Sequence, residues 1–197
     1  MRKGLSIFLT YVLLFACNAP EPQEQKVVWT RELIAEEVAE RIARSDTLPK
    51  LPADLQAILP DKWAPFISTE EKTQIPLSDH LYWTEAQKVY FQADRSFVEI
   101  FLMDYGTDRE AVLRLYEEYE EAQQSAGSSR EVWPEEKNSA FAWNWLDQRN
   151  HLHYLEAAVS ARFHILIRTN LPESRQVLES TWSKLAWKKL EEMGASH

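Results

Sequence analysis

Three histidines, His151, His153 and His164, are the residues whose type and spacing come nearest to a metal site. His151 and His153 alternate onto one face of the sheet at the start of a predicted strand, and His164 lies in the next predicted strand, diagonal to His153. Diagonal neighbours in a sheet lie about 7–8 Å apart, which would let two imidazoles share an ion such as Zn²⁺. Neither an HExxH motif nor paired cysteines accompany them. The sequence therefore predicts a mixed polar rim and no metal site.

Carboxylates are the second group that could do chemistry. Asp104 and Asp108 flank a turn and are expected to cap it, and the acidic run 117–121 is typical of a solvated helix face. The GxSxG, P-loop and GxGxxG motifs are missing, and the chain has four glycines. We therefore expect a binding or assembly module without a cofactor rather than an enzyme. An acid–base role for Asp104 or Glu99 is the alternative.

A short apolar segment opens the chain and ends at its single cysteine. Arg2 and Lys3 precede an apolar run over residues 5–16. This run is too short to cross a hydrocarbon core of about 30 Å, which takes about 20 helical residues, so it predicts a signal peptide. The sequence LFAC, which ends at Cys17, resembles the lipobox of bacterial lipoproteins, in which an aliphatic residue and two variable or small residues precede the acceptor cysteine.

The lipobox resemblance implies removal of a signal peptide, residues 1–16, followed by lipidation of Cys17 with diacylglycerol and by fatty acylation, typically with palmitate, of the new amine. Residues 17–28 would then be the lipidated cysteine and a flexible tether. Two or more acyl chains anchor a protein stably in a membrane. Asn18 stands where aspartate is typical of inner-membrane retention, so the outer membrane is favoured if the source is Gram-negative. A signal peptide followed by an unmodified cysteine is the alternative.

Composition limits the remaining partners and the domain count. Loss of residues 1–16, with two basic and no acidic residues, would move the formal net charge from −9 to −11, which disfavours nucleic acid as a partner. Without a second cysteine the domain has no disulfide. Residues 29–197 suffice for one core and are expected to form a single domain. The whole chain has eight Trp, seven Tyr and eight Phe, and those in this domain serve either to fill its core or to form a surface for stacking.

Hydrophobic periodicity divides this domain into an N-terminal segment, residues 29–76, and a sheet-and-helix part, residues 82–193. We expect a helix from a Thr30 cap to Arg44 and a short helical turn over 53–59. Further strands and helices are expected at 82–93, 97–104, 107–125, 140–146, 152–158, 162–169 and 172–193. The fold class is α+β, with one mostly antiparallel sheet and helices packed on one face. The order of elements resembles domains of the Mog1/PsbP group, a fold analogy that implies no function.

Residues 88–120 align with 153–185 without a gap, at an offset of 65. The alignment indicates either a ββα internal duplication or a chance match between two strand–turn–strand–helix units. If residues 94–95 form a two-residue turn, Val98 faces Phe91, and by the same count Phe163 faces Glu156. In this register these residues lie on the sheet face beneath the helices.

The opposite face of the sheet carries the predicted ligand- or partner-binding site. Its large apolar, aromatic and histidine side chains are Tyr90, Phe101, Met103, Trp143, Trp145, His153, His164 and Leu166. Contiguous exposed apolar area of this kind marks interaction sites. We expect an envelope protein or an apolar ligand to bind here. The alternatives are that residues 30–76 cover the face, that Trp143 and Trp145 bind a glycan, and that the protein is an envelope enzyme.

Overall fold

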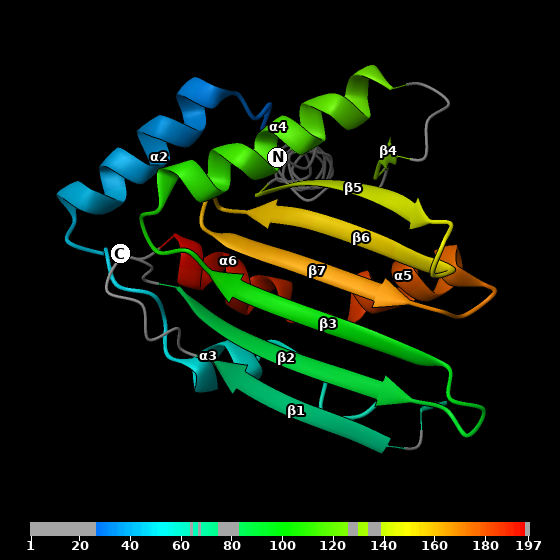
Figure 1. Ribbon diagram of the computed structural model, residues 1–197. Coiled ribbons are helices and arrows are strands. Elements are labelled where there is room, and N and C mark those ends of the chain that lie inside the picture. The colour runs from blue at the N-terminus through cyan, green and yellow to red at the C-terminus, as the bar shows by residue number, and fades with distance from the viewer. Residues whose placement is uncertain are drawn as a thin grey trace, which may run out of the picture.

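The computed structural model describes residues 27–63, 65–66, 68–74, 83–125, 130–133 and 139–195. The predicted signal peptide, Cys17 and most of the predicted tether lie outside these residues. The described chain forms one seven-stranded antiparallel sheet, in the order β1-β2-β3-β7-β6-β5-β4 (Figure 1). Its strands are β1 (Ser68–Gln74), β2 (Thr84–Phe91), β3 (Phe97–Asp104), β4 (Arg130–Val132), β5 (Ala140–Asp147), β6 (Leu152–Val159) and β7 (Phe163–Thr169).

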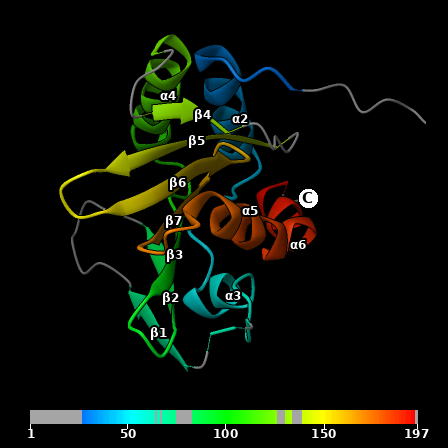
Figure 2. The ribbon, with the colours of Figure 1, turned by 90° about the vertical axis from the view of Figure 1, so that its right-hand side faces the viewer.

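Five described helices flank the sheet and confirm the α+β fold class: α2 (Arg31–Ala43), α3 (Pro52–Gln56), α4 (Arg109–Gln124), α5 (Ser174–Lys184) and α6 (Trp187–Gly194). They divide between the two faces instead of sharing one. Figure 2 shows α3, α5 and α6 on one side of the sheet, while α4, with α2 beside it, lies over the β5 end on the other. Phe141 and Ala142 are adjacent in β5 and therefore point to opposite faces of the sheet. Both are buried, so both faces of β5 are covered by helices.

The β2–β3 hairpin turns through five residues, 92–96, rather than two. Arg95, in the middle of this loop, has a left-handed φ of 71°. Val98 pairs with Tyr90, and the predicted partner Phe91 is one residue away. A one-residue shift turns every β2 side chain to the other face of the sheet. Tyr90 therefore lies in the core beneath α3 and not in the predicted site.

The β6–β7 hairpin departs from the predicted register by three residues. Its turn lies at residues 160–161, both left-handed, with φ of 52° and 45°. Phe163 pairs with Val159 and not with Glu156. Because three is odd, the β6 residues also exchange faces. His153 moves to the α5 side, and Glu156 moves to the side that carries His164.

The two edge strands were not predicted. β1 has the sequence STEEKTQ, and β4 has only three residues. Neither strand shows the apolar alternation from which a strand is predicted. Each lies at an edge of the sheet and is held there by backbone pairing with one neighbouring strand. The charges of β1 are typical of an edge strand that resists pairing with other chains.

Two helix termini follow the predictions to different degrees. Thr30 caps α2, as predicted, by accepting a hydrogen bond from the Leu33 amide (3.2 Å). Asp108 caps α4 by accepting a hydrogen bond from the Ala111 amide (3.0 Å), so the helix begins at Arg109, two residues after the predicted start at residue 107.

The last predicted helix is split into α5 and α6. Leu185 is extended (ψ 145°), which ends α5. The Trp187 indole then donates to the Trp182 carbonyl (2.7 Å), and the Ala186 amide donates to the Ile58 carbonyl (3.2 Å). These contacts turn α6 back onto the core and join it to the residues after α3.

Two buried arginines fix the N-terminal segment to the sheet. Arg41 of α2 donates to the carbonyls of residues 160–161 (2.8 and 2.5 Å). Arg162 donates to both carboxylate oxygens of Asp104 (2.8 and 2.9 Å) and to Asp46 (2.6 Å). The segment is thereby held at the β6–β7 turn, beside α4, and α3 lies on the far face, so neither helix covers the strands β1, β2 and β3 on the α4 side (Figures 1 and 2).

The proposed internal repeat is partial. At the offset of 65, β3 corresponds to β7, and Arg109 at the start of α4 corresponds to Ser174 at the start of α5. The two helices nevertheless pack on opposite faces of the sheet. The ββα unit is therefore not repeated as a packed unit.

Candidate functional site

The sheet face on the α4 side is uncovered by described helices over β1, β2, β3 and part of β7. We call this area the open face and define it by six half-buried side chains: Phe101, Met103, Trp145, Tyr154, Leu166 and Arg168. They stand on β3, β5, β6 and β7, which the pairing registers place side by side. The open face thus combines aromatic, apolar and guanidinium groups on neighbouring strands.

One row of the open face crosses four strands. The registers pair Glu99 with Arg168, Arg168 with Tyr154, and Tyr154 with Trp145. The rings of Tyr154 and Trp145 are stacked, with centroids 3.9 Å apart and an interplanar angle of 2°. The Arg168 guanidinium lies 5.5 Å from the centre of the Phe101 ring, within the range of a cation–π contact. The planar groups of this row are therefore held against one another.

Glu99 lies buried in the floor of the open face and holds its arginine. Its carboxylate accepts hydrogen bonds from the Arg168 guanidinium and from the Gln87 side-chain amide. Partial burial lowers the pKa of Arg168, but the hydrogen bond and charge of Glu99 outweigh it and raise this pKa overall. Arg168 is therefore a fixed cation whose charge is balanced within the face.

Glu156 holds the aromatic end of the row, as Glu99 holds Arg168. Its carboxylate accepts a hydrogen bond from the Trp145 indole (2.5 Å) and lies 3.2 Å from His164 Nε2. Burial raises the pKa of Glu156, but the hydrogen bonds and charge supplied by His164 and Trp145 lower it by more. Glu156 is therefore held as an ionised acceptor beneath Trp145.

The network ends at Tyr105, which follows β3. Its hydroxyl lies 3.3 Å from His164 Nδ1, and the two rings stack with centroids 6.1 Å apart. Burial raises the pKa of Tyr105 to about 12, so at neutral pH it is a neutral phenol and not an activated nucleophile. The chain Trp145–Glu156–His164–Tyr105 consequently fixes side-chain positions and supplies no nucleophile.

The structure brings together five of the eight predicted site residues: Phe101, Met103, Trp145, His164 and Leu166. Trp143 shares their face but is completely buried beside α4. Tyr90 and His153 lie on the opposite face because of the two register shifts.

Tyr154, Glu156 and Tyr105 are site residues that were not predicted. The predicted register places Glu156, and with it Tyr154 two residues away, on the core face. Because Tyr154 and Glu156 alternate with Leu155, the sequence shows that they share one face and that Leu155 lies on the other. Only the position of the β6–β7 turn shows which of these two faces packs against α5.

The groups considered for metal binding or catalysis are separated or already bonded. His153 and His164 lie on opposite faces of the sheet, which removes the predicted diagonal pair. In the part of the chain that the structure describes, no group of three or more His, Cys, Asp or Glu residues could hold a metal ion. Asp104 is fully buried and is bonded to Arg162 and to the Lys50 amide, as a structural carboxylate would be.

The chain matches no family model, no curated protein and no solved structure. Within the described ranges, none of the helices combines the length and the apolar character needed to cross a bilayer.

Proposed function

We propose that this chain is a bacterial envelope lipoprotein, anchored through lipid on Cys17, whose domain is a noncatalytic module that docks a partner protein on the open face. The observation that carries the proposal is that buried carboxylates hold half-buried planar side chains in fixed positions. Glu99 holds Arg168, and Glu156 holds Trp145. Side chains that are ordered before binding lose little conformational entropy when a partner docks.

The residue types of the open face support a protein partner. Tryptophan, tyrosine and arginine are enriched among residues that dominate binding energy, and methionine is enriched at interfaces. An apolar centre formed by Phe101, Met103 and Leu166 lies beside the ordered row. We expect the partner to present a complementary apolar patch bordered by hydrogen-bond acceptors.

The shape of the open face favours a protein over a small apolar ligand. Small ligands occupy cavities that bury most of their surface. Two cavities of the described chain, of about 290 and 480 Å³, are not lined by Phe101, Met103 or Leu166, although Trp145 and Tyr154 line the smaller one. A broad sheet surface of this kind suits docking of another folded surface.

Two features support an envelope module over an enzyme or a nucleic-acid-binding protein. The carboxylates considered for acid–base work, Asp104 and Glu99, are engaged by Arg162 and Arg168. The formal net charge of −9 opposes binding to nucleic acid.

Lipid anchoring is tested by the Cys17→Ser variant in the organism that makes the protein. We expect the wild-type chain to incorporate radiolabelled palmitate and to sediment with membranes, and the variant to lose both properties. The Ser6→Ala variant is the control for altered processing. Palmitate incorporation by the Cys17→Ser variant would contradict the proposal.

Docking on the open face is tested by photocrosslinking in cells. A photoreactive amino acid replaces Leu166, and a control places it at Lys188, an exposed α6 residue. We expect a discrete protein adduct from position 166, reduced at least tenfold by Trp145→Ala, and no adduct of that mass from position 188. The same adduct from both positions, or none from position 166, would exclude the open face as a docking surface. Quenching of Trp fluorescence by soluble glycan fragments, without a protein adduct, would favour the glycan alternative.

A further inference from the structure

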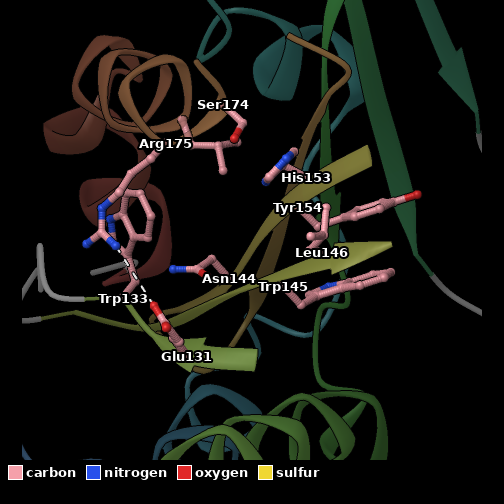
Figure 3. A pocket seen from close by; sticks show the side chains of 10 residues that line it. Glu131, Trp133, Asn144, Trp145, Leu146, His153, Tyr154, Ser174 and Arg175 are labelled. Atoms are coloured by element: carbon pink, nitrogen blue, oxygen red, sulfur yellow. Dashed lines mark ion pairs between the residues drawn. The ribbon is translucent and has the colours of Figure 1, made fainter. Parts of the chain in front are cut away.

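A separate cavity of about 290 Å³ lies on the α5 side of the sheet, where the ends of β5 and β6 approach the first turn of α5 (Figure 3). Its walls include Trp133, Asn144, His153, Ser174, Arg175 and Leu178. Figure 3 shows Asn144 and His153 directed toward this space, whereas the rings of Trp145 and Tyr154 point to the other side of the sheet. Trp145 and Tyr154 also line the cavity, but their rings belong to the open face, so the two sites share these residues and lie on opposite sides of the sheet.

Three polar side chains around the cavity make no hydrogen bond to other described residues. They are the side chains of Asn144, His153 and Ser174. Each carries groups that can both donate and accept a hydrogen bond, provided that the histidine is neutral. Burial lowers the pKa of His153 from its ordinary value, which favours the neutral imidazole at neutral pH. These groups match a hydroxyl group, which also both donates and accepts.

The charged groups beside the cavity are already paired with one another. The Arg175 guanidinium lies 3.9 Å from the Glu131 carboxylate and 3.2 Å from the Glu179 carboxylate. An anionic ligand would have to compete with two carboxylates for this one cation, and a cationic ligand would meet carboxylates that already have a partner. The balance of charge therefore favours a neutral ligand.

Apolar groups form the remainder of the cavity wall. Trp133 is 1% exposed and Leu178 is 3% exposed, and Leu146 lies near them. The Arg175 guanidinium lies 5.6 Å from the centre of the Trp133 ring. The Trp133 indole N–H has no hydrogen-bond acceptor among the described residues. A ligand here would meet an apolar wall on one side and uncommitted polar groups on the other.

We infer that this cavity binds a neutral polyhydroxylated ligand of the size of a single sugar ring. Its hydroxyl groups would bond to Asn144, His153 and Ser174, and the C–H face of the ring would pack against the half-buried Leu146, above the buried Trp133 and Leu178. Convergence of a few polar groups on a partly apolar cavity is typical of small-molecule sites. The inference is independent of the lipid anchor and of the docking surface.

The test is a titration of the isotope-labelled soluble domain, residues 18–197, with glucose and with N-acetylglucosamine, followed by amide and indole NMR signals. We expect saturable shifts of the Trp133 indole and Asn144 side-chain signals with at least one of these sugars. Asn144→Ala and His153→Ala should each weaken this binding at least tenfold. Both side chains are half-buried without hydrogen bonds to described residues, so these variants are expected to fold.

His151→Asn is the matched control, because His151 is exposed two residues from His153 and asparagine tolerates its φ of 53°. This variant should bind like the wild type, and sodium sulfate should cause no saturable shift of the two reporter signals. The proposal is overturned if neither sugar shifts these signals saturably. It is equally overturned if sulfate saturates them, or if binding is unchanged in Asn144→Ala and His153→Ala.

Discussion

Buried carboxylates determine how the half-buried side chains of the open face are oriented. Glu99 is 4% exposed and Glu156 is 9% exposed, although carboxylates are costly to bury unless they are paired and hydrogen-bonded. Their partners are Arg168 and Gln87 for Glu99, and Trp145 and His164 for Glu156. Buried hydrogen-bond acceptors thus fix planar groups that a solvated sheet face would leave mobile.

Replacement of Glu156 should reveal the stabilising effect of its charge through the pH dependence of stability. Its folded-state pKa lies below the ordinary 4.5, so its contribution is present above pH 4.5 and is lost as the pH falls through the folded-state value. We expect Glu156→Gln to lower the free energy of unfolding by about 1–2 kcal/mol near neutral pH. The deficit should shrink as the pH falls below the ordinary pKa. Urea unfolding across this pH range measures both effects.

Glu85 on the same face provides the control with the opposite sign. Burial, and then the charge of Glu99, raise its pKa above 4.5, so its ionisation disfavours folding as the pH rises past that value. Glu85→Gln should therefore leave stability unchanged or slightly higher at neutral pH. A loss of stability in Glu85→Gln equal to that in Glu156→Gln would contradict the distinction between the two carboxylates.

Asp104 is expected to be the most sensitive ionised residue in the described chain. Asp104 and Arg162 have no exposed surface, and removal of the carboxylate would leave a buried guanidinium with Asp46 as its remaining ion-pair partner. Asp104→Asn should lower the free energy of unfolding by about 2–4 kcal/mol. Glu117→Gln, which breaks a half-exposed pair with Arg31, should cost less than about 1 kcal/mol. Equal losses in chemical denaturation would contradict this account.

At the scale of elements, the β6–β7 turn is the point where several segments meet. Two consecutive residues with left-handed φ, Ser160 and Ala161, form the turn, and neither is a glycine. Their carbonyls accept hydrogen bonds from Arg41 of α2. From the other side, Gly194 at the end of α6 lies so close that an added Cβ would be 2.4 Å from the Ser160 Cβ. The turn therefore joins both termini of the domain to the sheet.

This close approach predicts strong coupling between positions 160 and 194. Gly194→Ala should lower the free energy of unfolding by about 1–3 kcal/mol, because the new methyl group overlaps the Ser160 side chain. Ser160→Gly removes that side chain and relieves the left-handed strain. In the double variant the cost of Gly194→Ala should fall by at least about 0.5 kcal/mol. Thermal or urea unfolding of the four proteins tests the cycle, and additive effects would refute the predicted contact.

At the scale of the whole molecule, the helices protect the two faces of the sheet unequally. The α5 side is covered along the sheet by α3, α5 and α6. On the other side α4 covers the β5 end, and the N-terminal helix α2 packs beside α4. The side chains of the open face consequently remain half-buried.

Unequal coverage predicts different reactivity for two tryptophans of one strand. Trp143 is 0% exposed beside α4, whereas Trp145, two residues along β5, is half-buried on the open face. Hydroxyl-radical labelling of the isolated soluble domain should modify Trp145 and leave Trp143 protected, as fragment-ion mass spectrometry would show. Equal protection of both residues would mean that the open face is covered in the free domain.

The amino-acid sequence by itself determined the features that depend on local chemistry and periodicity. Helix α2 with its Thr30 cap, strand β3 and the α+β fold class follow from alternation of apolar residues and from capping preferences. Alternation also placed Phe101 and Met103 together, and Leu166 with His164 near them. The resemblance of residues 14–17 to a lipobox is likewise local, and lipidation of Cys17 stays a prediction.

Only the tertiary structure decided which residues share each face and what those faces meet. A shift of one residue at the 92–96 loop moved Tyr90 into the core, and a shift of three at the β6–β7 turn placed Glu156 beneath Trp145. Alternation has period two, so it groups residues without stating which group faces the helices. The polar edge strand β1 and the division of helices between two faces depend on backbone pairing and long-range packing, which leave no periodic signal in the sequence.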